Sequence, residues 1–157
     1  PRMKLVLVRH AEAESPGWVD SDRELTLRGH KQAQETSAWL ASKVAQPSVL
    51  LVSPYRRARE TAATIQQALP HAALHVVDHI TPEDSVRQAI ADLELAPRGD
   101  VVIVVSHMPL VAGLAGWLEH GVVTAGQPFS LAEARLYELA LLGPSLAWLK
   151  DRFIPAL

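Results

Sequence analysis

The sequence predicts an α/β fold, a three-layer α/β/α sandwich around a mostly parallel central sheet with an antiparallel hairpin at one edge. Two patterns predict it: short apolar runs without alternation, and amphipathic helical segments between those runs. Composition agrees, since 48% of the 157 residues are hydrophobic and 20% are charged. We therefore expect one domain, spanning residues 1–157, with a full hydrophobic core.

The expected elements alternate along the chain. Apolar runs predict strands at residues 5–8, 49–52 and 101–105, with a weaker candidate at 74–77. Apolar residues at helical spacing predict helices over residues 27–44, 58–69, 86–93 and 110–118. Thr26 is the expected N-cap of the first helix. The segments 134–142 and 146–150, joined by Gly143-Pro144-Ser145, predict the closing hairpin.

Charge and composition exclude several classes of protein. The formal net charge is −2 and the 15 basic residues are scattered, which argues against binding of nucleic acid or of an anionic membrane. The chain has no cysteine, which excludes disulfides, a thiolate nucleophile and zinc sites built on sulfur. The apolar run before Arg9 is too short for a signal sequence or a membrane span, so we expect a cytoplasmic protein.

Two expected strands end in a histidine. Arg9-His10 follows the first strand and Ser106-His107 follows the run at 101–105, at the carboxyl edge where α/β enzymes place their sites. Arg57 opens the helix after the strand at 49–52 and can point across the same edge. Two guanidinium groups, two imidazoles and nearby helix N-termini suit a phosphoryl group, whose oxygens arginine binds bidentately.

Helical geometry distinguishes Arg57 from its basic neighbours. Arg57 precedes the core position Ala58, whereas Arg56 and Arg59 should lean outward as a solvated face. Ser53 and Ser106 are expected first as cap or turn residues, with phosphate contact as a second role.

Four fragments in order carry a resemblance to a known family. They are residues 8–11, 22–29, 53–61 and 106–111. In this order, and at these places in the predicted α/β fold, the four fragments resemble those of the histidine phosphatase superfamily, the group that also holds the phosphoglycerate mutases. Within it, the short phosphohistidine phosphatases of the SixA type look most similar. The resemblance implies a phosphoglycerate-mutase-like fold.

The resemblance also implies roles for individual residues. His10 would be the nucleophile, Arg9 and Arg57 would bind phosphate, and His107 would stabilise the transferring group. The substrate would be phosphohistidine on a partner protein, such as a histidine phosphotransfer domain, and the enzyme would be a monomer. No metal or cofactor is expected, because cationic side chains can supply the charge stabilisation of a metal ion.

The sequence departs from the broad family pattern at two points. Ala11 stands where most members have glycine, a variant that favours the short group. No residue can be assigned by motif to the glutamate acid/base of larger members, and the candidates are His79, Glu83 and Asp84. An imidazole leaving group needs less acid assistance than an alkoxide, so a phosphohistidine phosphatase could tolerate this loss.

Other interpretations stay open. The short segment 62–106 leaves little room for insertions over the pocket, which favours a protein substrate. A small-molecule phosphomonoesterase could instead use residues 12–25 and 121–129, the expected rim, as lids. A non-catalytic module could bind phosphorylated partners through the same pocket.

A metal-binding protein is the remaining alternative. His71, His75 and His79 stand four apart, which on a helix would align three imidazoles. Pro70 and the strand-like residues 74–77 argue against a helix there.

Overall fold

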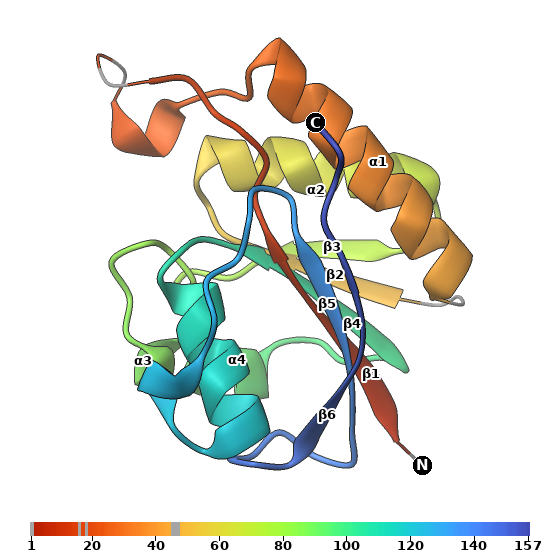
Figure 1. Ribbon diagram of the computed structural model, residues 1–157, viewed down its shortest axis with the longest axis vertical. Helices are drawn as coiled ribbons and strands as arrows, with labels where there is room; N and C mark the ends of the chain where they lie inside the picture. Colours follow the sequence, from red (N-terminus) through yellow and green to blue (C-terminus); the bar gives the residue numbers. More distant parts are fainter. Residues whose placement is uncertain (1, 16, 18, 45–47) are drawn as a thin grey trace.

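One mixed β-sheet lies between two layers of helices in the computed structural model, which describes residues 2–157 apart from 16, 18 and 45–47 (Figure 1). Its strands are β1 (Met3–Arg9), β2 (Ser48–Val52), β3 (Ala73–Val76), β4 (Val101–Ser106), β5 (Ala134–Leu139) and β6 (Ala147–Phe153). The helices are α1 (Leu27–Lys43), α2 (Arg56–Ala68), α3 (Val86–Leu95) and α4 (Leu110–His120). Short 3₁₀ turns cover Asp20–Asp22 and Val123–Ala125.

The strand order is β3-β2-β4-β1-β5-β6. Strands β1 to β4 are parallel to one another, whereas β5 runs antiparallel to β1 and β6 antiparallel to β5. The expected sandwich, its parallel strands and its antiparallel edge hairpin are therefore confirmed. The weak strand candidate forms β3, at the edge opposite the hairpin.

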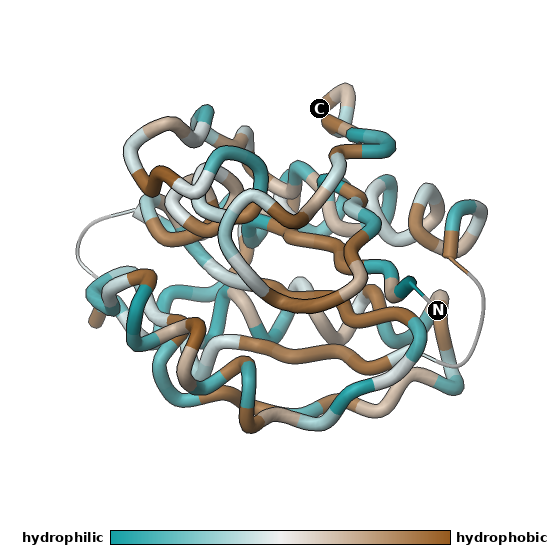
Figure 2. Tube along the Cα trace, turned by 90° about the horizontal axis from the view of Figure 1, so that it is seen from below, coloured by the Kyte–Doolittle hydropathy of each residue, from teal (hydrophilic) through white to brown (hydrophobic). Residues whose placement is uncertain are grey.

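The core has one apolar layer on each face of the sheet. Because neighbouring side chains of a strand face opposite sides, Leu5 and Leu7 pack in the layer with α3 and α4, whereas Val6 and Val8 pack in the layer with α1 and α2. Figure 2 shows the hydrophobic strands running through the middle of the molecule. This double covering explains the apolar runs without alternation.

The first turn of α1 fixes the loop that follows β1. Thr26 caps the helix as expected, its Oγ1 accepting a hydrogen bond from the Gly29 N–H at 2.9 Å. The loop passes so close that a Cβ at Gly29 would overlap the carbonyl oxygen of Glu12. Glycine is therefore required there, and the contact holds the loop at the carboxyl end of the sheet.

None of the helices in the described part of the chain is both long and apolar enough to cross a membrane.

Candidate active site

Arg9, His10, Arg57 and His107 meet in one cavity of about 360 Å³ at the carboxyl ends of β1, β2 and β4. Arg9 ends β1 beside Ser106, the last residue of β4, so His10 and His107 leave adjacent strands at the same level. Figure 1 shows these strand ends opening toward the loops that precede α1, α2 and α4. The other residues that line the cavity are Glu12, Ala13, Arg23, Met108 and Leu131.

The main chain around His10 is held on three sides. The His10 N–H donates to the Ser106 carbonyl at 3.0 Å, and the His10 carbonyl accepts from the Ala132 N–H at 3.1 Å. The next N–H, of Ala11, donates to Thr61 Oγ1 of α2 at 3.1 Å. A side chain on so constrained a backbone keeps a fixed position in the cavity.

The ring of His10 is held in one tautomer. Its Nδ1 lies 2.7 Å from the carbonyl oxygen of Ala11, which can only accept, so Nδ1 carries the proton. Nε2 therefore keeps its lone pair, toward which Arg57 Nε donates at 3.3 Å. Burial, together with the charges of Arg57, Arg9 and Arg23, lowers the pKa of His10 to about 3. The imidazole is thus neutral near pH 7, with its basic nitrogen in the cavity.

His107 is a second neutral imidazole beside His10. The two ring centroids are 5.1 Å apart. His107 Nε2 lies 2.7 Å from Ser53 Oγ, while Nδ1 is buried and finds no hydrogen-bond partner among the described residues. Burial and the neighbouring His10 and Arg57 lower the pKa of His107 to about 2. A neutral histidine here can donate one N–H to a bound anion without adding a charge.

Arg57 points into the cavity, whereas Arg56 and Arg59 do not line it. The Arg57 side chain is 5% exposed and its Nη1 donates to the Asp20 carbonyl oxygen at 2.6 Å. Its guanidinium also lies over the Tyr55 ring, 5.0 Å from the centroid. Arg56 instead pairs with Glu60 and Glu24, both at 2.8 Å.

Arg9 is anchored at one nitrogen and leaves another without a partner. Its Nη1 donates to the Phe129 carbonyl oxygen at 2.9 Å, and its buried Nε has no hydrogen-bond partner within the described chain. Burial and the charge of Arg57 lower the pKa of Arg9, while Glu133 raises it. Holding the guanidinium groups of Arg9 and Arg57 close together costs free energy, and a bound phosphate dianion would offset that cost.

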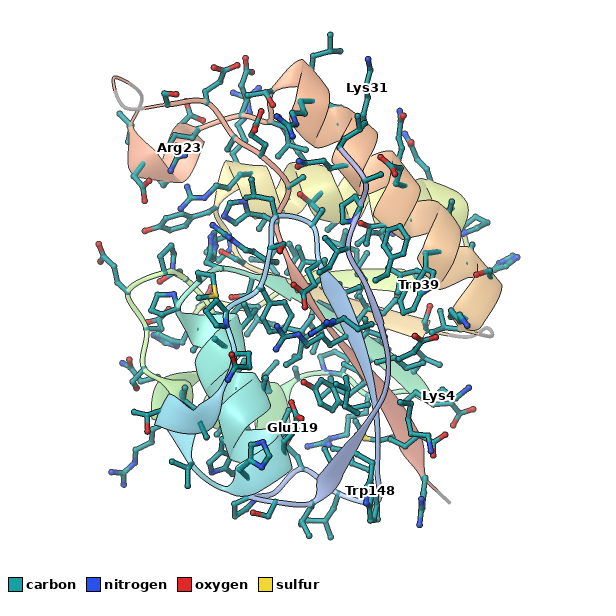
Figure 3. All side chains as sticks on the ribbon, in the orientation of Figure 1. Lys4, Arg23, Lys31, Trp39, Glu119 and Trp148 are labelled. Atoms are coloured by element: carbon teal, nitrogen blue, oxygen red, sulfur yellow. The ribbon has the colours of Figure 1, made fainter. Side chains whose placement is uncertain are left out.

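Two of the lining residues had no role assigned from the sequence. Arg23, labelled in Figure 3 on the loop from β1 to α1, donates to Asp20 at 3.1 Å and gives the cavity a third guanidinium group. Glu12 is the carboxylate that lines the cavity, and its Oε1 accepts from Thr26 Oγ1 at 2.8 Å. Both residues lie in the segment 12–25 that was expected only as a rim, and Arg23 also lies in the fragment 22–29; no spacing indicated which way either side chain points.

The two serines are buried and hydrogen-bonded within the protein. Ser53 Oγ accepts from the Tyr55 N–H at 3.2 Å as well as contacting His107. Ser106 Oγ donates to the Ile80 carbonyl at 2.7 Å. Neither serine lines the cavity, and Ser53 acts on it through His107.

The three acid/base candidates lie outside the cavity lining. His79 is exposed and bonds Asp92 at 2.9 Å, while Asp84 accepts from the Thr81 N–H and hydroxyl. Glu83 is exposed near Tyr55, whose pKa is raised first by burial and then by the charge of Glu83. The structure therefore does not bring these three residues to the two histidines.

The histidine triplet does not share a helix face. His75 lies in β3, and His71 and His79 lie in the turns on either side of that strand. No group of three metal-ligating side chains is found in the described ranges of the chain.

Comparisons with known proteins identify similar sequences. A model of the histidine phosphatase superfamily (branch 1) matches residues 5–81, a stretch that includes Arg9, His10 and Arg57. The phosphohistidine phosphatase SixA homolog of Haemophilus influenzae is 33% identical over 126 residues, covering 74% of this chain and 77% of that protein. Phosphohistidine phosphatase SixA of Escherichia coli K12 is 32% identical over 120 residues, covering 74% of each chain.

The fold is also similar to solved structures. A structure of the protein histidine phosphatase SixA complexed with tungstate superposes with a TM-score of 0.80 at 25% identity, covering 98% of this chain and 97% of that one. Tungstate has the tetrahedral shape and charge of phosphate, the kind of anion that the arginines and histidines of this cavity can bind.

Proposed function

Since the chain belongs to the histidine phosphatase superfamily and is a phosphatase, we propose that it removes phosphate from phosphohistidine on a partner protein through a phosphohistidine intermediate on His10. The observation that carries the proposal is the buried, neutral His10. Its Nε2 lone pair opens into a cavity lined by three guanidinium groups. A nucleophile needs that lone pair, and a phosphoryl dianion needs those charges.

In the first step, His10 Nε2 attacks the phosphorus of the substrate. A P–Nε2 bond forms as the P–N bond of the substrate breaks, and the leaving imidazole keeps that electron pair and gains a proton from solvent at its other nitrogen. Arg57 Nε, which donates to Nε2 at 3.3 Å in the free pocket, turns to a phosphoryl oxygen. The Nδ1–H bond to Ala11 steadies the positive charge that develops on the ring.

In the second step, water attacks the same phosphorus and His10 Nε2 leaves with the electron pair of the P–N bond. Arg9, Arg23, Arg57 and His107 line the cavity and hold the equatorial oxygens through both steps.

A protein substrate is favoured over a small phosphate ester by the placement of carboxylates. The acid/base candidates Glu83 and Asp84 do not line the cavity, and Glu12, which does, already accepts from Thr26. An alkoxide leaving group needs a well-placed acid, whereas an imidazole does not. The relatives named above are themselves phosphohistidine phosphatases.

The test is to trap the intermediate and compare substrates. With a phosphohistidine-bearing phosphotransfer protein, the enzyme should turn over and give an acid-labile, alkali-stable phosphoenzyme. His10→Ala should abolish both while binding inorganic phosphate within a few-fold of the parent, because the arginines supply most of the ground-state affinity. Arg57→Ala should lose about 2 to 4 kcal/mol in kcat/KM, since it acts on both binding and rate.

His79→Ala is the matched control, because it removes an exposed histidine that pairs with Asp92 and does not line the cavity. Residual turnover of His10→Ala within tenfold of the parent would reject the covalent route. Faster turnover of a sugar phosphate than of the phosphoprotein would favour the small-molecule alternative, and binding without turnover of any substrate would favour the binding module.

A further inference from the structure

A buried ion pair lies next to the cavity without lining it. Arg135 Nε donates to Glu133 Oε2 at 2.6 Å, and the two side chains are only 4% and 2% exposed. Taking two charges out of water costs several kcal/mol each, which their attraction offsets only when hydrogen bonds satisfy the remaining polar atoms. The residues that hydrogen-bond to the remaining polar atoms of Glu133 and Arg135 therefore indicate what the ion pair does.

Apart from Arg152 Nε, which lies 4.0 Å from Glu133 Oε2, the remaining side-chain contacts of the pair fall on four consecutive residues, 127–130, which we call the 127–130 loop. Arg135 donates from Nη1 to the Gln127 carbonyl at 3.2 Å and from Nη2 to the Pro128 carbonyl at 2.8 Å. Its guanidinium stacks 3.8 Å from the centroid of the Phe129 ring. Glu133 Oε1 accepts from the Ser130 N–H at 2.8 Å. One ion pair thus fixes the backbone of the whole loop.

The 127–130 loop in turn holds Arg9. Its Phe129 carbonyl is the acceptor for Arg9 Nη1 at 2.9 Å. The Arg9 N–H donates to the Glu133 carbonyl at 3.1 Å, so the pair also reaches Arg9 through the main chain. Arg135 is opposite Leu7 in the β1–β5 register, and residues 7 and 9 of β1 share a face, which places both arginines on the same side of the sheet.

Arginine is required for this arrangement. A planar guanidinium can reach three oxygens from fixed directions and stack on a ring at once, whereas a lysine ammonium is a point donor on a flexible stem. A buried pair is by itself weak support for stability, and an apolar pair of similar volume would serve a core equally well. We propose that Glu133 and Arg135 are positioning residues that set the orientation of the Arg9 guanidinium toward the phosphoryl group. This inference rests on the proposed function, in which Arg9 binds phosphate.

The experiment is a double-mutant cycle on the affinity for inorganic phosphate, measured by calorimetry on the full chain. Arg135→Lys should weaken phosphate binding about tenfold, because the Phe129 carbonyl shifts and Arg9 loses its orientation. In the Arg9→Ala background, Arg135→Lys should change the affinity by less than about twofold, since there is no Arg9 left to orient. A role in stability alone would leave affinity per folded molecule unchanged in both backgrounds.

Two further variants keep the test decisive. Ile65→Val, in the core layer on the other face of the sheet, destabilises the fold without touching the loop and should leave phosphate affinity unchanged. If Arg135→Lys does not fold, Glu133→Gln, which keeps the shape and removes the charge, takes its place in the same cycle and should again lose its effect when Arg9 is absent.

The outcomes separate the two proposals. Equal losses from Arg135→Lys with and without Arg9 would overturn the positioning role and leave the proposed function intact. Unchanged phosphate affinity in Arg9→Ala would overturn the positioning role together with the assignment of Arg9. A strong coupling without turnover of phosphohistidine would support the positioning role and reject the proposed function.

Discussion

At the scale of single residues, the chemistry of the cavity depends on which nitrogen of His10 carries the proton. A contact with the next carbonyl in the chain, that of Ala11, decides it. The sequence could predict that His10 and His107 each follow a buried strand, because apolar runs mark those strands. It could not predict the tautomer or the burial of Ser53 against His107, because these depend on side-chain directions set by packing.

The lowered pKa values of the two histidines predict how stability varies with pH. Both are about 3 or lower in the fold and near 6.5 in the unfolded chain, so only the unfolded state gains protons as the pH falls below about 6.5. The free energy of unfolding should therefore decrease on going from about pH 7 to about pH 5, by up to about 2 kcal/mol for each histidine. Urea denaturation at the two pH values measures this.

His107→Gln is the comparison for that measurement, because glutamine does not titrate and its longer side chain carries an amide at about the distance of Nε2, the atom that contacts Ser53. This variant should lose less stability than the parent between the two pH values. An equal loss in parent and variant would contradict the low pKa of His107.

At the scale of elements, the sequence predicted every strand and helix, because the helices carry apolar residues at helical spacing, the parallel strands are short apolar runs, and a Gly-Pro-Ser turn marks the hairpin. The loop between β1 and α1 was predicted only as a rim. Its path depends on the bridge between Ala13 and Leu25 and on the Leu25 N–H, which donates to Glu60 Oε1 at 2.8 Å. Such contacts between distant residues have no periodicity, and this explains why Arg23 was missed as a lining residue.

The close approach of this loop to α1 predicts a large effect of one added methyl group. Gly29→Ala would place a Cβ on the Glu12 carbonyl oxygen, so the loop or the helix must move. Alanine normally favours a helix by about 1 kcal/mol over glycine, yet here we expect a destabilisation of about 2 to 3 kcal/mol. Activity should fall as well, because Glu12 and Ala13 line the cavity. Thermal unfolding and turnover of the purified variant measure both effects.

Gln34→Ala, at an exposed position of the same helix, should leave stability and turnover nearly unchanged. If Gly29→Ala proved as stable as Gln34→Ala, the loop would not lie against the helix as described.

At the scale of the whole molecule, one edge of one sheet brings residues from distant segments of the chain, 9–13, 23, 57, 107–108 and 131, into the same cavity. The predicted α/β sandwich placed the strand ends together, but no pattern in the chain indicated the strand order, in which β4 separates β1 from β2. That order places the two histidines side by side, and α2 contributes Arg57, whose Nε contacts His10.

The three guanidinium groups of the cavity predict that activity survives removal of metal ions. Arg9, Arg23 and Arg57 supply the positive charge that a phosphoryl transition state requires. Turnover measured after exhaustive chelation should stay within about twofold of the untreated enzyme. Loss of turnover that zinc or manganese restored would support the alternative with His71, His75 and His79.

The position of β1 in the sheet also constrains how the protein is made. Lys4 of β1 pairs with Val101 on one side and with Glu138 on the other, so both partners of this strand are synthesised long after it. Until then the apolar segment that leads into His10, the proposed nucleophile, has no partner strand on either side, and such unpaired strands are prone to aggregation. The phosphatase site consequently forms late in folding, and a nascent chain that ends before β4 holds His10 without the neighbouring strands that orient it.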